Sequence, residues 1–372
     1  MSVSSARSSV RISADVRRPS PIVQGGLFSR ARDALFNNLH NTILSVVLLV
    51  LCVDAAWNAL HWAVWGAVWH TDDPEMCKQA AGACWAIVGE KYRLILFGTF
   101  PYDEQWRPFI AVLLILGLAV ISAFRSLWSR YLVYAWIALV PVVLVLMLGG
   151  VFGLKFTDTH LWGGLPLTLI MAVVTVVFGL PGAILLALGR LSKLPAIKAL
   201  CVGITEITRG LPLLVVLFMA AIMLPMFLPQ TLRIDKFVSA QIAMIIYFAA
   251  YAAEIVRGGL QAVPVGQYEA AEAAGLTYGQ RMRRVILPQG LRIVIPALMN
   301  DIIRAFKNTT FVSILGLYDI LGATSAATQD PKWVQFAPEA YLFVFMLYFV
   351  FCFSMSKYSE SFARDLSQGR NY

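Results

Sequence analysis

Three charged residues stand inside a long apolar stretch near the C-terminus. Asp301, Arg304 and Lys307 follow one another at intervals of three residues, so on a helix they share one face. Ionisable groups at membrane depth are costly and are functional candidates. In one interpretation Arg304 or Lys307 lines a polar path and binds the carboxylate of a crossing solute; in the other, Asp301 only neutralises Arg304. Both stay open, and further polar residues extend the stripe: Asn300, Asn308, Thr309 and Thr310.

Two more acid–base pairs stand near the ends of apolar segments. Glu206 with Arg209, and Glu254 with Arg257, are each spaced three residues apart. That spacing favours local pairing on one helix, with a gating role as the alternative. Asp54 also lies within an apolar segment, where we expect it to pack against another polar group.

The sequence holds none of the usual arrangements for catalysis or metal binding. It has no G-x-x-x-x-G-K-[ST] phosphate loop and no nucleophile–base constellation. The five cysteines show no paired metal spacing. Only Cys77 and Cys84 lie outside the apolar segments and their edges, so one optional disulfide is the most we expect. We therefore predict no catalytic residue, metal or cofactor on this chain.

Composition excludes a soluble enzyme. Apolar residues make up 59% of the 372 residues and charged residues 14%, against about 45–50% and about 25% in soluble domains. The core of a soluble protein of this length could not bury this excess of apolar side chains. The net charge of +9 is then explained by an anionic membrane surface rather than by nucleic acid.

About eight apolar windows are long enough to cross a bilayer as helices, which takes about 20 residues each. The sequence therefore predicts an all-α, integral membrane helical bundle of about eight transmembrane helices. The windows are 43–69, 108–124, 131–154, 162–189, 210–229, 238–256, 293–317 and 340–356.

Orientation follows from the basic residues. Residues 1–40 are rich in Ser and Arg and predict a flexible basic tail, with a transit peptide as the alternative. With the N-terminus inside, Lys and Arg are about twice as frequent in the inside segments, as the positive-inside rule requires. Both termini, including the tail 358–372, are then expected in the cytoplasm, and the loop 70–107 outside.

One predicted inside loop, residues 257–292, is much longer than the others. Residues 268–274 are good helix formers, Gly275 suits the left-handed position after a helix, and Thr277 is an N-cap candidate for a second helix that ends near Leu287. Four alanines leave one face of this elbow almost bare. We expect a docking element; a solvated hairpin without a partner is the alternative.

The elbow resembles the EAA loop of ABC-transporter permeases. The matching residues are Glu269, Ala270, Ala271, Gly275, Leu287 and Pro288, with Val285 where the family usually has Ile. Segments 206–214, 252–259, 263–267 and 307–313 are similar to the polar-amino-acid importers, and 100–108 to the longer permease of general L-amino-acid importers of Gram-negative bacteria.

The resemblance implies a type I permease core of five helices, residues 161–357, after a three-helix extension, residues 41–160. It implies a translocation subunit that moves L-amino acids across the bacterial inner membrane, in contact with membrane lipid. The implied partners are a dimer of ABC ATPase subunits that holds the ATP and Mg, a second homologous permease subunit and a periplasmic amino-acid-binding protein. The six EAA-loop residues would dock the ATPase.

The sequence leaves two alternative functions open. An ion-coupled secondary amino-acid transporter would use Asp54, Glu254 and Asp301 as coupling carboxylates. A non-transporting membrane scaffold would have no polar path. Neither alternative explains the elbow loop.

Overall fold

The structure, a computed structural model, describes residues 32, 34–229 and 234–368. The chain divides into two compact units, 1–66 and 67–372, which are described separately. Seven helices in the described ranges are long and apolar enough to cross a membrane, and a bent pair makes an eighth candidate. This confirms the predicted all-α bundle of about eight spans.

The first unit is one long helix with its flanking residues. Helix α2 (Leu39–Leu60) continues into a π-helical turn at His61–Trp65. Trp57 and Trp65 stack with ring centroids 5.9 Å apart, which suits the amphipathic indole ring at a membrane interface. The predicted basic tail, residues 1–40, falls mostly outside the described residues.

The second unit contains the other six long helices. Helices α7 and α11 are in extensive contact, and α11 also packs on α14. Small residues allow the close approach that membrane helices need: a Cβ on Gly179 would meet the Phe248 ring at 2.5 Å, and one on Gly259 would meet the Gly290 carbonyl oxygen at 2.5 Å. The six are α5 (Trp106–Ala123), α6 (Arg130–Leu148), α7 (Gly164–Arg190), α11 (Lys236–Gln261), α14 (Leu287–Asn308) and α16 (Ala337–Gln368).

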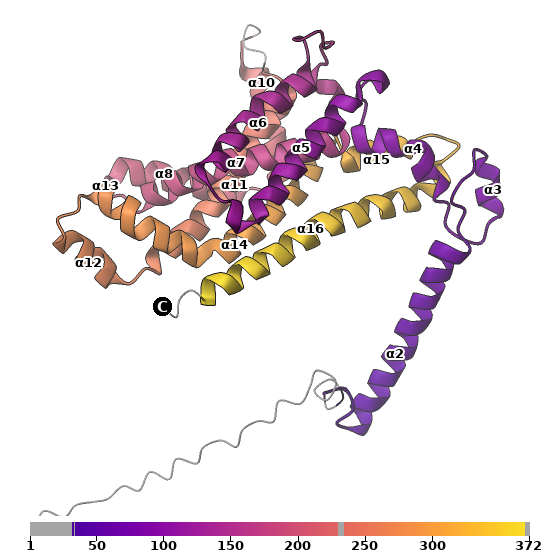
Figure 1. Cartoon of the computed structure of the whole chain (residues 1–372), viewed down its shortest axis with the longest axis horizontal. Coiled ribbons are helices and arrows are strands. Elements are labelled where there is room, and N and C mark those ends of the chain that lie inside the picture. The colour runs from indigo at the N-terminus through magenta and orange to yellow at the C-terminus, as the bar shows by residue number, and fades with distance from the viewer. Residues whose placement is uncertain (1–31, 33, 230–233, 369–372) are drawn as a thin grey trace, which may run out of the picture. The chain divides into compact units, whose positions relative to one another are not determined.

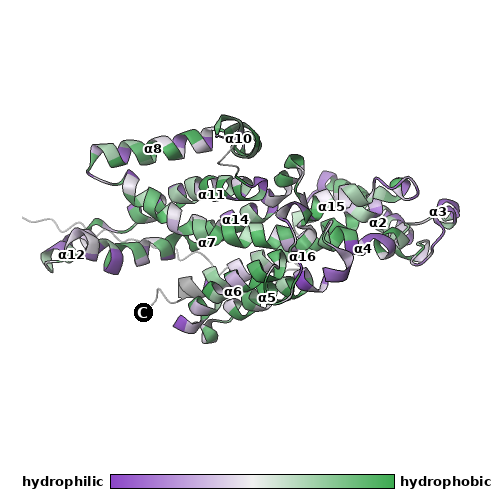
Figure 2. Ribbon diagram, turned by 90° about the horizontal axis from the view of Figure 1, so that it is seen from above, coloured by the Kyte–Doolittle hydropathy of each residue, from purple (hydrophilic) through white to green (hydrophobic). Residues whose placement is uncertain are grey.

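The segment after α7 differs from its prediction. Residues 190–209 were expected to be a short loop, but most of them form α8 (Pro195–Gly210), bent by 110° from the following helical segment. Proline at the first position of α8 favours its start, and Pro212 disfavours helical backbone at Leu211. Figure 2 shows alternating apolar and polar residues along α8. The segment beyond the bend comprises α9 (Leu213–Phe218), a π turn (Met219–Met223) and α10 (Leu224–Phe227).

One end of the second unit, which we call the α15 end, is built from short elements (Figure 1). The segment predicted as the loop 70–107 contains two helices, and the Cys77–Cys84 disulfide is formed. Strand β1 pairs with Gly163 and Gly164 at the start of α7. These elements are α3 (Pro74–Gln79), α4 (Ala86–Phe97), β1 (Tyr318–Asp319) and α15 (Ile320–Ala327). In the unit as a whole, 3-10 turns lie at Tyr102–Glu104, Thr159–Leu161, Thr309–Leu315 and Val334–Phe336, and a further one, Arg125–Leu127, joins α5 to α6.

The opposite end, which we call the loop end, carries the predicted elbow as α12 (Val265–Ala273) and α13 (Tyr278–Arg281). After α13 a π turn at Met282–Ile286 leads into α14. The elbow's second helix is therefore not separate from the seventh span but forms its beginning. Helix α16 likewise runs to Gln368, through most of the segment predicted as a C-terminal tail.

Candidate functional site

The bend of the elbow has the geometry that the sequence predicts. Gly275 has φ +74°, in the left-handed region that residues with a Cβ rarely adopt. Thr277 then caps α13: its hydroxyl accepts from the Gln280 N–H, and the Gln280 side chain accepts from the Thr277 N–H at 3.0 Å. This reciprocal capping box fixes the direction of the second arm.

The docking candidates do not all face outward. Glu269, Ala270 and Gly275 are exposed, and Glu269 makes no hydrogen bond or ion pair within the described part of the chain. Ala271 is only 5% exposed and packs inside the elbow, so it cannot offer its side chain to a partner. At the start of α14, Pro288 is exposed and Leu287 is half-buried.

The second acid of the elbow has an internal partner. Glu272 pairs with Arg281 across the bend, with Oε2 and Nη1 2.6 Å apart. This ion pair holds α12 against α13. Glu272 is therefore already paired, whereas Glu269, which has no ion-pair partner among the described residues, is free to meet a partner.

Two polar contacts attach the elbow to the bundle. The Tyr268 hydroxyl donates to the Leu260 carbonyl of α11 at 2.8 Å, and partial burial raises the pKa of this phenol. The Gln289 amide of α14 donates to the Gln267 side chain at 3.1 Å. The elbow is thereby attached to α11 and α14, two helices of the bundle's core.

The charged stripe of α14 separates into a pair and a free cation. Asp301 is 7% exposed and pairs with Arg304, as the neutralisation interpretation predicted. Lys307 is exposed, and among the described residues no carboxylate lies within ion-pair distance of its ammonium. The pair accounts for Asp301 and Arg304, and the polar-path interpretation remains a prediction for Lys307.

Lys307 borders a cleft of about 550 Å³ between α14 and α16. Small-molecule sites usually measure about 300–1,000 Å³, so the cleft has room for a small solute. Its lining mixes polar and aromatic side chains. They are Asn300, Ile303, Arg304, Lys307, Asn308, Phe349, Cys352, Phe353 and Ser356.

Comparison with known proteins places this arrangement in a family. Residues 179–368 match the model of the binding-protein-dependent transport system inner membrane component, a range that covers α11, the elbow, α14 and α16. The chain belongs to this family of transport permeases. The EAA loop is part of the family pattern, so the elbow of this permease is the family's loop.

Relatives match beyond that range. The inner membrane amino-acid ABC transporter permease protein YhdY of Escherichia coli is 41% identical over 91% of this chain and 93% of its own. The glutamate/glutamine/aspartate/asparagine transport system permease protein BztC of Rhodobacter capsulatus is 34% identical over 94% of this chain and 96% of its own. The probable amino-acid permease protein YxeN of Bacillus subtilis is 34% identical over 55% of this chain and 90% of its own.

Near the loop end of the permease, five charged residues join three helices into an arginine–glutamate cluster. The sequence predicts pairs within α8 and within α11; the Glu254–Arg257 pair is present, while Glu206 and Arg209 lie 4.0 Å apart. Arg190 of α7 was not foreseen: its Nη2 lies 2.9 Å from Glu206 and 3.4 Å from Glu254. The cluster thus ties α8 to α7 and α11.

Tyr251 of α11 connects this cluster with the stripe on α14. The Arg304 guanidinium lies 4.2 Å from the Tyr251 ring centroid, within the range of cation–π attraction. The Tyr251 hydroxyl donates to the Arg209 carbonyl at 3.3 Å. Aromatic residues carry no charge signal in the sequence, so neither Tyr251 nor the link it makes could be identified from the charge pattern.

Proposed function

We propose that this permease moves L-amino acids across the bacterial inner membrane as one of two homologous permease subunits of an ABC importer. An ATPase dimer bound at the elbow would supply the energy from its own ATP and Mg, and a periplasmic binding protein would deliver the substrate. The observation that carries the proposal is the exposed Glu269, which pairs with none of the described residues and lies on an elbow attached to α11 and α14. The names of the relatives support the amino-acid substrate.

The energy source distinguishes this proposal from an ion-coupled transporter. We expect amino-acid uptake by the reconstituted complex to stop when ATP is removed and to continue when an ionophore collapses the membrane potential. The reverse pattern would indicate coupling through carboxylates such as Asp301 or Glu254. A complex that takes up no amino acid under either condition would favour the scaffold.

Orientation is part of the proposal: both termini and the elbow in the cytoplasm, the α15 end outside. The Cys77–Cys84 disulfide lies at the α15 end, and disulfides persist in oxidising compartments such as the periplasm. The proposed orientation thus agrees with where a disulfide is stable. Because Cys77 and Cys84 are themselves buried, the test uses Gln335→Cys, which is exposed at the same end. A membrane-impermeant maleimide should label this cysteine in intact cells, and not only after permeabilisation.

The substrate path is proposed to pass Lys307, with Asp301 and Arg304 as the neutralised part of the same stripe. An ammonium group without a partner is costly in a low-dielectric passage, and the carboxylate of an amino acid in transit would stabilise it. The cleft beside Lys307 offers the space for that contact.

We expect Lys307→Met to lower amino-acid uptake about tenfold or more, because the variant keeps the length of the side chain and removes the charge. The loss of one charge-assisted hydrogen bond, about 1.5–3 kcal/mol, corresponds to that factor. The measurement is uptake in proteoliposomes at equal permease content. Lys193→Met, which changes an exposed lysine in the loop after α7, is the control. Wild-type uptake by Lys307→Met across several amino acids would show that this lysine is not on the path.

A further inference from the structure

Helix α15 packs its apolar side chains against α4 of the N-terminal extension, and it also contacts α7 and the start of α16. Ile320 and Ala327 belong to one hydrophobic cluster with Ile87 and Ile95 of α4. The same cluster includes the start of α16, through Ala340 and Val344, and both disulfide cysteines. These side chains are nearly inaccessible, with Ile87, Ile95, Cys84 and Ala340 at 0% and Ala327 at 1% exposure.

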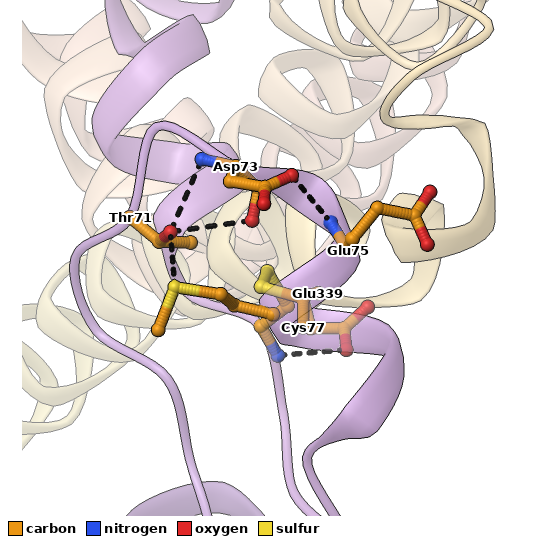
Figure 3. Close-up of a disulfide and its surroundings, with 7 residues drawn as sticks. Thr71, Asp73, Glu75, Cys77 and Glu339 are labelled. Carbon is orange, nitrogen blue, oxygen red and sulfur yellow. Dashed lines mark hydrogen bonds between the residues drawn. A yellow bond between two sulfur atoms is a disulfide. The ribbon is translucent and has the colours of Figure 1, made fainter.

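Polar contacts reinforce the same junction. The Cys84 N–H donates to the Glu339 carboxylate of α16 at 3.1 Å, and Figure 3 shows this carboxylate beside the disulfide. The Lys91 ammonium of α4 lies 2.9 Å from the Asp330 carboxylate, which follows α15. Lys91 holds the pKa of Asp330 below its ordinary value. Each contact joins the extension to the segment 319–344.

The backbones at this junction are too close to admit side chains. Gly98, which ends α4, has φ +60°, and a Cβ on it would lie 2.6 Å from the Gly163 Cα. A Cβ on Gly163 would in turn lie 2.8 Å from the Tyr318 carbonyl oxygen. The end of α4, the start of α7 and β1 therefore meet in a fixed arrangement.

A disulfide lies within the part of this junction that the extension contributes. Cys77 of α3 is bonded to Cys84 across the turn that precedes α4, with Cα atoms 5.5 Å apart. Val68 and Cys84 pair as a short parallel bridge. A covalent link of this kind restricts how far its loop can open, so it keeps Cys84 beside Glu339.

Helix α15 follows the polar stripe of α14 along the chain. After Asn308 the chain runs through the 3-10 segment Thr309–Leu315 to β1 and α15. The Ile320 N–H donates to the Thr168 hydroxyl of α7 at 3.1 Å, so the first residue of α15 is also fastened to the core. Contacts that fix the position of α15 therefore also fix the α15 end of the segment that carries Lys307.

The shorter relative from Bacillus subtilis aligns over 55% of this chain and 90% of its own length. It is too short to contain counterparts of both the core and the whole extension. A relative of this length therefore lacks at least part of the extension or of the core.

We propose that residues 67–105, which we call the brace, hold α15 and the start of α16 against α7 and so position the α15 end of the transport path. The Cys77–Cys84 disulfide keeps the brace closed. The statement about packing depends on the structure alone; the statement about the path rests on the proposed function. The two statements need separate readouts.

The packing statement is tested by thiol labelling of the full-length protein in lipid nanodiscs, in which Cys52, Cys201 and Cys352 are replaced by Ala. The reporter is Ala327→Cys, buried between α15 and α4; Gln335→Cys, exposed at the same end, is the control. We expect a maleimide to label Ala327→Cys at least tenfold faster when Cys77→Ser and Cys84→Ser remove the disulfide. Labelling of Gln335→Cys should stay constant.

Unchanged protection of Ala327→Cys in the disulfide-free protein would overturn the brace. If the serine variants do not insert, Lys91→Met, which breaks the pair with Asp330, provides the same comparison.

Uptake tests the second statement. We expect the disulfide-free permease, with its other cysteines restored, to transport severalfold more slowly than the parent. If the disulfide-free permease transports at the parental rate although Ala327→Cys has become accessible, the link between the brace and the path is wrong. Failure of the proposed function would instead appear as no uptake by the parent, while labelling still reports on the brace.

Discussion

Replacing Gly275 by Val should reduce ATP-dependent uptake at least tenfold while the permease remains inserted in the membrane. The φ of +74° at this position costs a residue with a Cβ roughly 1–2 kcal/mol, and a β-branched side chain more. Relief of this strain would change the angle between α12 and α13. Because Glu269 and Ala270 lie on the arm before the bend, their presentation to an ATPase would change with it.

Gly275→Asn separates backbone strain from simple crowding. No atom lies within 4 Å of a Cβ built on Gly275, so either side chain fits the space inside the permease, and Asn tolerates the left-handed conformation better than Val. We expect Gly275→Asn to retain most of the uptake and to co-purify with the ATPase, and Gly275→Val to lose both. Normal uptake by Gly275→Val would contradict the docking role of the elbow.

The elbow could be predicted from the sequence because its determinants are local. A glycine after a run of helix formers and a capping Thr277 act within a few residues of themselves, and the structure reproduces both. The number of spans was predictable for a similar reason, since a bilayer requires long apolar segments. The end of the elbow was not. Pro288 favours an end near Leu287, but residues 282–286 form a π turn and the helix continues through this proline into α14.

What the sequence did not predict depends on contacts between distant segments. Arg190 carries no sign that it will meet Glu254, because the two residues become neighbours only when α7 packs on α11. Helix α8 was missed because its charged residues dilute the hydropathy signal, although its apolar spacing was available to a search for amphipathic helices. The brace was assigned to a loop because α4 is buried by α15, more than 200 residues later in the chain.

Asp319 provides a second large expected effect, on stability. This carboxyl is fully buried at the start of α15, where Oδ1 accepts from the Gly322 N–H at 2.9 Å. Burial raises the pKa of Asp319 to about 7, with Tyr348 of α16 as the titratable neighbour. Because the folded-state pKa lies above the unfolded value of about 3.9, the protonated carboxyl stabilises the fold at low pH, and this contribution is lost as the pH rises to about 7.

We therefore expect the midpoint of thermal unfolding of the purified permease to fall between about pH 4 and pH 7 and to level off above pH 7. A pKa difference of this size corresponds to a few kcal/mol at about 1.4 kcal/mol per unit. Asp319→Asn keeps an oxygen that can accept from Gly322 and cannot ionise, so its unfolding midpoint should fall much less over that range and exceed that of the parent at pH 8.

Asp330→Asn is the matched control for the sign of this effect. The pKa of Asp330 is lowered by Lys91, so its contribution is present above the unfolded pKa and is lost only as the pH falls through the still lower folded value. Removing Asp330 should therefore leave the slope between pH 5 and pH 7 unchanged, whereas Asp319→Asn should flatten it. A slope that persists in Asp319→Asn would mean that another group titrates there and that the α15 end is not held by a protonated carboxyl.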